Sequence, residues 1–530
     1  MTGTTRIEAT YPRQRRRPVD APPGQGTVLV GALDRGFAID ATDRINAAAL
    51  APGAPPPTAL AGALGAAIFG ENGRVRLLRD PLGLGKLFWA RGDDGRILLA
   101  ARPIRLVEAG CRFDDIHALP LGTCVDLDPE SGATAVSPIV LWPDPAEAGP
   151  GQPGGRPVDP ATATDPDGAE PGHPAGSAAE DAREPMSSSG TPAGTGESEP
   201  LLRSLDALAA RIRDDLHRYC RALAERFADR RIYVCLSGGL DSTGVLILAR
   251  EYFTDVVAVS FDLDRARRTP SEDRATARRL ARELSVPLLE VTVGEDVLLE
   301  PVDTVIAEGI DWRDFNVHAA LVNAALARGI AEEEAARGVP SGPGATPDTA
   351  NHATAAPTDP PALVFTGDLM NEFLADYREE TYRGATHYRL PRLPPGRLRD
   401  ALVRGLETSH REIGVFEAWG LPVVQLYAGA AAALLRLPGS FLGTPDAKQR
   451  LNRAVHGGRI PEYVYARGKA RAQIGDPRTG RGVLALCVER GLDEAEFRRR
   501  FARLHRTDPT AGPGRFIRAG RYRSAVPCRD

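Results

Sequence analysis

The first quarter of the chain consists of short hydrophobic runs separated by glycine, aspartate and asparagine. The runs are TVLVGAL, ALGAAIF, RVRLLRD, KLFWAR and RILLAA. Short apolar segments with turn residues between them are typical of antiparallel strands that pack against a hydrophobic core. We therefore predict a β-rich domain over residues 26–142.

The pattern changes after residue 200. Leu201–Phe227 has helical periodicity, and the apolar runs RIYVCLS, VVAVSFDL, PLLEVTV and ALVFTGD are separated by helix-like segments such as Thr243–Tyr252 and Glu272–Leu284. Strands that alternate with helices predict a parallel sheet with helices on both faces. The fold class expected for residues 201–505 is therefore α/β.

Polar, low-complexity segments separate these regions. Residues 143–200 and about 338–361 are rich in proline, glycine and alanine and nearly lack large apolar side chains. Such segments bury too little surface to offset the entropy of ordering them. We predict a disordered linker at 143–200 and an insertion at 338–361, with a flexible extension at 1–25 and a tail at 506–530.

Composition narrows the functional classes. The 66 basic residues nearly balance the 70 acidic ones, so the chain lacks the basic excess of a nucleic-acid-binding protein. Its six cysteines form no CxxC pair, and no apolar run reaches the roughly 18 residues of a membrane span. We predict a cytoplasmic protein without nucleic-acid or membrane partners.

The stretch VCLSGGLDSTG places two glycines, two serines and an aspartate between an expected strand and an expected helix. Glycines allow close backbone approach, and the N–H groups at a helix start bind anions. A carboxylate among these donors makes sense if Mg²⁺ lies between it and a phosphate. The spacing is not that of a Walker loop, whose lysine is absent. The candidate nucleotide-binding residues are Leu236, Ser237, Gly238, Gly239, Leu240, Asp241 and Ser242.

The SGGLDS segment resembles the pyrophosphate loop of ATP pyrophosphatases, and further segments resemble the asparagine synthetase family. These segments are RLLRDPLGLGKLFWARGDDGRILLAARPIRLVEAG, DDIHALPLGTCVDLD, SEDRATARRLARELSVPLLEV and IPEYVYARGKARAQIGD. The resemblance implies an Ntn-hydrolase-like αββα sandwich followed by a synthetase domain of the adenine-nucleotide α-hydrolase-like type. It also implies ATP and Mg²⁺ as cofactors.

The chain departs from the glutamine-hydrolysing members of that family. Thr27 stands where their N-terminal cysteine would be, and their glutamine-binding signatures are missing after Asp34. The resemblance then implies a domain without glutaminase activity. One alternative is cleavage between Gly26 and Thr27, which would expose a threonine nucleophile.

The segment FTGDLMNEFLADY resembles the family's glycine-glutamate-glycine-x-aspartate-glutamate motif. Asp368 then replaces the first glutamate and Asn371 replaces a Mg²⁺-binding aspartate. Because an asparagine carbonyl carries no charge, either the metal is held more weakly or Glu372 or Asp368 supplies the missing carboxylate. For Asp368 and Glu372 an acidic helix start is an equal alternative to catalysis.

The resemblance completes the candidate site. Lys469 matches the lysine that stabilises charge at the adenylated carboxyl, Arg467 assists it, and Ser260 and Gly367 are expected beside the nucleotide. Asp241 and Asn371 are the expected metal ligands.

The implied function is that of an ATP-dependent ligase of specialised metabolism, in which a small-molecule or peptide carboxylate is adenylated and passed to an amine or ammonia. Alternatives are an intramolecular cyclase of the lasso-peptide or β-lactam type and an inactive nucleotide-binding homologue. Specificity is expected from residues 311–323 and 381–425. The sequence leaves the oligomeric state open, with a homodimer as one alternative.

Overall fold

The computed structural model describes residues 7–9, 29–31, 56, 59–60, 62–69, 74–93, 97–128, 134–141, 199–264, 271–338, 362–407, 409–467, 473–474 and 482–508. Apart from residues 199–200 the expected linker lies outside this part, as do Thr27, the N-terminal extension except for residues 7–9, nearly all of the 338–361 insertion and most of the C-terminal tail.

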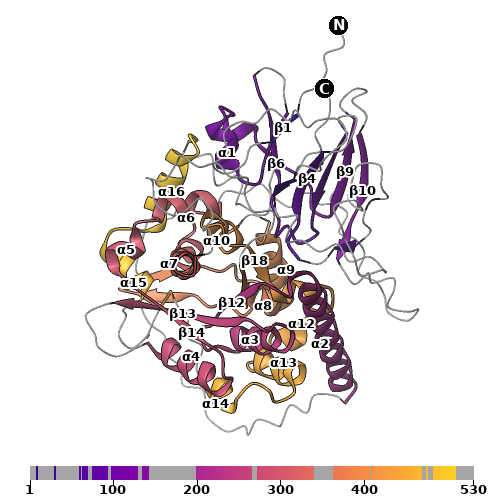
Figure 1. The fold of residues 1–530 in the computed structure, drawn as a ribbon, viewed down its shortest axis with the longest axis vertical. Helices are drawn as coiled ribbons and strands as arrows, with labels where there is room; N and C mark the ends of the chain where they lie inside the picture. Colours follow the sequence, from indigo (N-terminus) through magenta and orange to yellow (C-terminus); the bar gives the residue numbers. More distant parts are fainter. Residues whose placement is uncertain are drawn as a thin grey trace, which may run out of the picture.

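Two sheets form the N-terminal region (Figure 1). The first has the order β1 (Ile7–Ala9), β7 (Ile97–Ala100), β6 (Phe88–Arg91) and β8 (His117–Ala118), and the second has the order β10 (Thr134–Pro138), β9 (Thr123–Leu127), β5 (Val75–Arg79), β4 (Gly65–Phe69) and β2 (Leu29–Gly31). A separate two-stranded sheet joins β3 (Ala59–Leu60) to β11 (Val140–Leu141). Within the two sheets the pairing is antiparallel except between β1 and β7, while β3 and β11 are parallel. The prediction of antiparallel strands is thus correct for most pairs.

The two larger sheets share a core. Val75 and Leu77 of β5 form one buried cluster with Trp89 of β6 and Leu99 of β7. Alternate residues of a strand point to opposite faces, so these positions lie between the sheets. Among the described residues of this region α1 (Pro103–Glu108) is the one α-helix. The Ntn-type sandwich that the resemblance implies for this region remains a prediction.

A five-stranded parallel sheet organises the second region. Its order is β14 (Leu288–Gly294), β13 (Val256–Asp264), β12 (Arg231–Cys235), β15 (Ala362–Thr366) and β18 (Val423–Gln425). In register, Val234 lies beside Ala258 on one neighbour and beside Phe365 on the other. The residues that follow β12 and β15, and Ser260 within β13, therefore come together at one edge of the sheet. The predicted α/β class is confirmed.

Helices cover both faces of this sheet, with α3 and α4 on one side and α7 and α10 on the other (Figure 1). The helices are α2 (Glu199–Phe227), α3 (Leu240–Tyr252), α4 (Glu272–Glu283), α5 (Glu295–Leu299), α6 (Val302–Gly309), α7 (Asp314–Ala336), α8 (Met370–Leu374), α9 (Pro395–Gly405), α10 (Ile413–Ala418), α11 (Ala431–Leu434), α12 (Gly439–Leu442), α13 (Ala447–His456), α14 (Glu462–Ala466), α15 (Val483–Glu489) and α16 (Glu494–Leu504). Short 3-10 helices span Phe113–Asp115 and Leu426–Ala430, and β16 (Glu380–Tyr382) pairs with β17 (Ala385–His387).

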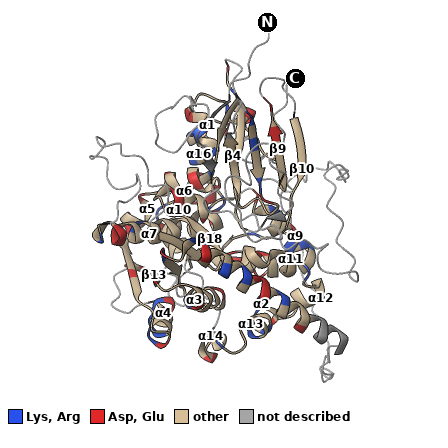
Figure 2. Cartoon of the chain, turned by 45° about the vertical axis from the view of Figure 1, so that its right-hand side comes forward, with Lys and Arg blue, Asp and Glu red and all other residues tan. Residues whose placement is uncertain are grey.

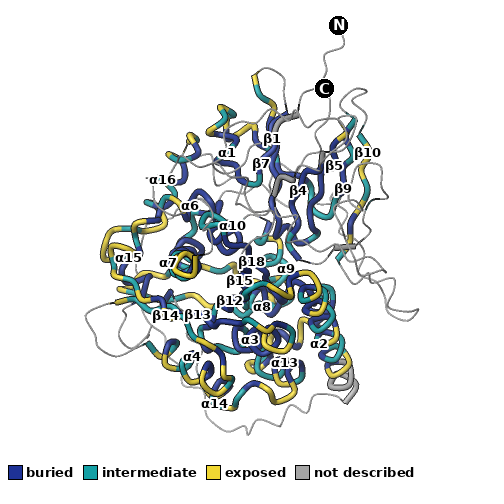
Figure 3. Tube along the Cα trace, viewed as in Figure 1, coloured by how far each residue is buried: buried dark blue, intermediate teal, exposed yellow. Residues whose placement is uncertain are grey.

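Burial explains why the central strands read as continuous apolar runs. All five residues of β15 are buried, as are Ile232, Tyr233 and Val234 of β12 (Figure 3). In a strand that is covered on both faces, apolar and polar residues do not alternate, because both sets of side chains are buried. On the outer helices α2 and α4, by contrast, basic and acidic residues are interspersed (Figure 2).

The loop after β5 joins the two regions. Asp80 is buried and accepts hydrogen bonds from backbone N–H groups, including that of Gly85 at 2.7 Å. The same loop brings Lys86 Nζ to 2.7 Å from the carbonyl oxygen of Leu406. Arg79 forms an ion pair with Glu407 at 3.5 Å. The β-rich region therefore contacts Leu406 and Glu407, which precede the segment at Arg411 and Glu412 that lines the cavity described below.

Among the described residues no helix combines the length and the apolar character needed to cross a membrane.

Candidate functional site

The SGGLDS segment forms the turn between β12 and α3. Gly238 has φ +72°, a conformation that glycine adopts without steric cost, and Gly239 is the N-cap residue of α3. Among the described residues no side chain caps this helix start. Ser237 Oγ and Ser242 Oγ lie 3.2 Å apart across the turn. Two hydroxyls and the first N–H groups of a helix thus face the same point, which favours an anion.

A cavity of about 510 Å³ lies against this turn. Its lining includes Leu236, Ser237, Gly239, Leu240, Asp241, Ser242, Ser260, Gly367, Asp368, Asn371 and Arg467, which are candidates from the sequence. Of the other described candidates, Gly238 lies against Thr276 and Glu372 lies behind the wall of the cavity. Lys469 lies outside the described residues.

Gly367 directly follows β15 and lies in close contact with the start of α3, the helix after the SGGLDS loop. A Cβ atom added at Gly367 would lie 2.9 Å from the backbone nitrogen of Ser242 and 3.1 Å from Cβ of Asp241. Any side chain here would displace the first turn of α3. Glycine at this position therefore allows the two strand ends to approach and form one site.

Lys448, which the sequence analysis missed, lies at the centre of the expected metal site. From α13 its Nζ reaches Asp241 Oδ2 at 2.5 Å, Asn371 Oδ1 at 2.8 Å and Asp376 Oδ2 at 3.4 Å. Burial lowers the pKa of Lys448, but the carboxylates of Asp241 and Asp376 outweigh this and raise it above its ordinary value. The lysine is therefore a cation at neutral pH, and no motif or spacing around it announces that position.

Two carboxylates and an amide oxygen are the kind of donor set that Mg²⁺ takes. No group of three or more His, Cys, Asp or Glu side chains in the described part of the chain is arranged to hold a metal. The oxygens around Lys448 do not form such a group, because one of the three belongs to the amide of Asn371. The residues present fit a divalent cation that shares its coordination with a phosphate.

Asp368 follows β15 and faces the cavity. Burial raises the pKa of its carboxyl to about 8, and the negative charge of Glu412 adds to the rise, while Arg411 opposes it. A carboxyl group with a pKa near neutrality is suited to accept and return a proton during a reaction. The geometry keeps Asp368 as a candidate acid or base.

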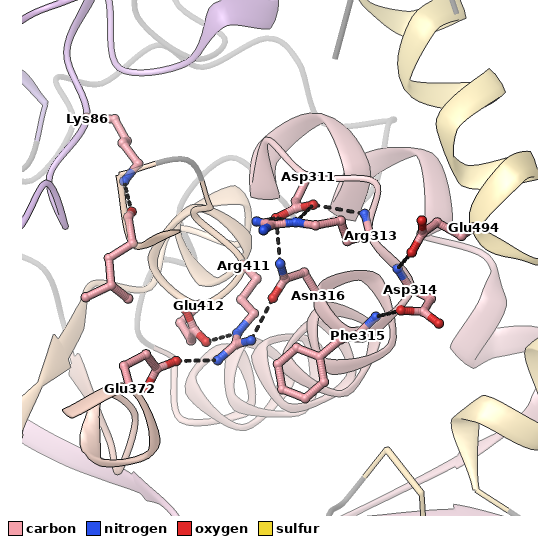
Figure 4. A network of polar contacts seen from close by, with 11 residues as sticks. Lys86, Asp311, Arg313, Asp314, Phe315, Asn316, Glu372, Arg411, Glu412 and Glu494 are labelled. Atoms are coloured by element: carbon pink, nitrogen blue, oxygen red, sulfur yellow. Dashed lines mark hydrogen bonds and ion pairs between the residues drawn. The ribbon is translucent and has the colours of Figure 1, made fainter. Parts of the chain in front are cut away.

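Glu372 is engaged away from Lys448, in a network around the buried Arg411 (Figure 4). Arg411 contacts Glu372 Oε1 at 3.3 Å and Asn316 Oδ1 at 2.7 Å, and it also pairs with Glu412. The hydroxyl of Tyr377 donates to Glu372 at 2.5 Å. The expectation that Glu372 or Asp368 replaces the carboxylate missing at Asn371 stays a prediction, and the structure places a further carboxylate, that of Asp376, beside the Lys448 ammonium.

The start of α7 extends this network, within the region expected to set specificity. Asn316 Nδ2 donates to Asp311 Oδ2 at 2.6 Å, and the guanidinium of Arg411 lies 4.8 Å from the centre of the Phe315 ring. Phe315 lines the cavity. One wall of the cavity is thus an aromatic ring held by a buried cation.

Arg467 supports the phosphate loop from α14. It donates to the carbonyl oxygen of Ser237 at 2.9 Å and pairs with the partly buried Asp273 at the start of α4. Burial raises the pKa of Asp273, and the charge of Arg467 opposes the rise. The contacts of Arg467 therefore position the loop, whereas the sequence assigned it to the acyl group.

Leu369 takes the place of the second glycine in the family motif. It is buried with φ +81°, a left-handed conformation that costs a leucine about 1–2 kcal/mol. This conformation turns the chain between Asp368 and α8. A strained residue that the surroundings hold in place often marks a functional segment.

Comparison with solved structures gives weak likenesses. An NH3-dependent NAD synthetase from Campylobacter jejuni subsp. jejuni NCTC 11168, in complex with the nitrate ion, is 14% identical, with a TM-score of 0.21 over 37% of this chain and 71% of that chain. An NMN synthetase from Francisella tularensis is 12% identical, with a TM-score of 0.20 over 50% of this chain and 98% of that chain. No curated protein matches the sequence.

A family model matches one part of the chain. It is described as asparagine synthase and covers residues 218–345, from within α2 to beyond the end of α7. These residues contain the SGGLDS loop, β13 and one wall of the cavity. The sequence of residues 218–345 is therefore similar to the asparagine synthase family.

Proposed function

We propose that this protein is an ATP-dependent ligase that joins a carboxylate to an amine through an acyl-adenylate. The observation that carries the proposal is the single cavity in which the SGGLDS loop, the Lys448 ammonium and Asp368 face one another. The asparagine synthase match of residues 218–345 supports ATP-dependent ligation.

In the proposed reaction the chain first holds ATP. The N–H groups of the first turn of α3 and the hydroxyls of Ser237 and Ser242 bind phosphate oxygens. Ser260 Oγ is buried without a hydrogen-bond partner among the described residues, and we assign it to the nucleoside. Mg²⁺, held by Asp241 and Asn371, would neutralise charge on the phosphates.

Two bond exchanges follow. A carboxylate oxygen of the substrate attacks the α-phosphorus of ATP. The bond between the α-phosphorus and the oxygen that bridges it to the β-phosphorus breaks, and pyrophosphate leaves. The amine nitrogen then attacks the acyl carbon, the carbon–oxygen bond to AMP breaks, and the amide forms. Asp368 in its ionised form, which its pKa of about 8 makes available as the pH approaches 8, accepts the proton that the amine loses, and Lys469 is proposed to stabilise the oxyanion.

The test is the formation of pyrophosphate, AMP and hydroxamate from ATP, hydroxylamine and pools of amino acids, dicarboxylates and peptides. We expect one pool to give all three products with the unaltered chain and none with Asp241→Ala. Asp255→Ala is the matched control, because Asp255 pairs with Arg231 at the opposite end of the sheet. ADP instead of AMP, or ATP binding without pyrophosphate in every pool, would refute the proposal.

A further inference from the structure

Three oxygens from two segments converge on Lys448 Nζ. Asp241 comes from the first turn of α3, while Asn371 and Asp376 come from α8 and the residues after it. Helix α8 ends at Leu374, and the φ of +53° at its C-cap residue Ala375 reverses the chain. The N–H of Asp376 then donates to the carbonyl oxygen of Asn371 at 2.9 Å. This turn is the reason that Asp376 lies beside Asn371.

Among these four side chains there are two carboxylates and one ammonium. Asp241 and Asp376 each carry one negative charge, Asn371 carries none, and Lys448 contributes one positive charge. A divalent cation in the place of the ammonium would balance both carboxylates. All four side chains line the same cavity as the SGGLDS loop, so a cation bound to nucleotide phosphates reaches them.

We propose that Asp376 is a ligand of the divalent cation that accompanies the nucleotide, and that it supplies the carboxylate which Asn371 lacks. The Lys448 ammonium holds the same position in the nucleotide-free chain and leaves it when the cation enters. The proposal deepens the proposed function, on which it rests for the identity of the nucleotide.

The other nearby carboxyl groups do not serve this role. Glu372 is bound to Arg411 and to the hydroxyl of Tyr377. Asp368, with its pKa of about 8, holds a proton at neutral pH and is then a poor ligand for a hard cation. Asp376 is the remaining carboxylate of the described cavity lining that contacts the same ammonium as Asp241.

The experiment measures cation binding without turnover. Free Mn²⁺ is followed by electron paramagnetic resonance in the presence of the full chain and a non-hydrolysable α,β-methylene analogue of ATP. We expect Asp376→Asn to weaken Mn²⁺ binding about tenfold or more. The double variant Asn371→Asp with Asp376→Asn moves the carboxylate by one ligand position and should recover most of that loss. Asp255→Asn is the control and should bind like the unaltered chain.

The ammonium is tested separately. Lys448→Met should bind Mn²⁺ in the absence of nucleotide more tightly than the unaltered chain, because the carboxylates no longer have a bound cation. Circular dichroism and urea unfolding verify that each variant is folded. Unaltered Mn²⁺ affinity in Asp376→Asn would reduce Asp376 to a structural partner of Lys448 and overturn the proposal.

Two further results would also overturn it. One is a folded double variant that recovers none of the lost affinity, and the other is absence of Mn²⁺ binding by the unaltered chain with the analogue. A chain that binds Mn²⁺ through Asp376 but releases no pyrophosphate in the ligase assay would refute the proposed function and leave this inference standing.

Discussion

Replacement of Asp368 by asparagine should stabilise the fold while it removes activity. The folded chain holds this carboxyl protonated up to a pKa of about 8, whereas its ordinary value is 3.8. Below pH 3.8 the group is protonated in both the folded and the unfolded chain, so the two proteins differ little. Between pH 3.8 and 8 only the unfolded chain loses the proton, so the native protein loses stability as the pH rises.

The size of the effect follows from that interval. One pKa unit corresponds to about 1.4 kcal/mol, so a proton held at pH 7 would cost the native state about 4 kcal/mol. Asp368 lines a cavity that water enters, which weakens the effect, and we expect a gain of roughly 2 kcal/mol for Asp368→Asn at pH 7. Asparagine has the same shape and cannot ionise, so packing changes little.

The assay is urea unfolding of both proteins at pH 4, 5.5, 7 and 8. The measurement at pH 4 is the internal control, since the two unfolding free energies should nearly agree there. Loss of the proton acceptor should lower kcat in the ligase assay by about 100-fold or more. Equal stability of the variant and the parent at every pH, or a gain that shrinks as the pH rises, would refute the assignment of a neutral Asp368.

Three further predictions concern the scaffold. Gly367→Ala should abolish binding of a fluorescent ATP analogue in a folded chain, because its Cβ would displace the first turn of α3; normal binding would contradict the close approach. Leu369→Gly should be about 1 kcal/mol more stable than Leu369→Ala in urea unfolding, since φ is +81°, and the usual order of these residues would argue against strain. Arg102→Ala should destabilise the chain by about 3 kcal/mol, because it removes a buried cation that pairs with Glu417 and with the buried Glu308. Arg112→Ala, at an exposed pair of 3.8 Å, is its control and should change stability by less than about 0.5 kcal/mol.

The local sequence pattern was sufficient to predict the parallel sheet and the phosphate loop. The runs that became β12, β13 and β15 are buried on both faces, and this gives an apolar signal that needs no knowledge of partners. The SGGLDS turn lies within a few residues of chain, so its glycines and hydroxyls could be recognised together. The helix after it begins at Leu240, three residues earlier than the periodicity placed it.

The rest of the site is assembled by tertiary contacts that no spacing encodes. Lys448 meets Asp241 across 207 residues and Arg411 meets Asn316 across 95. Asp376 could be linked to the cation only once the left-handed turn at Ala375 was seen. The missing charge at Asn371 was visible in the sequence, whereas Asp376, the residue proposed to compensate for it, was not.

The contact between Lys86 and the carbonyl oxygen of Leu406 limits how the two regions of this protein can be separated or exchanged. Leu406 precedes Arg411 by five positions, so the β-rich region helps to fix one wall of the cavity, although none of its described residues lines that cavity. If residues 201–505 were expressed alone, the surface around Leu406 that contacts Lys86 would be exposed to solvent. In a chimaera with another β-rich region, the position of Arg411 would shift. If the proposed function holds, mutations in the β-rich region would alter substrate choice from positions far from any substrate.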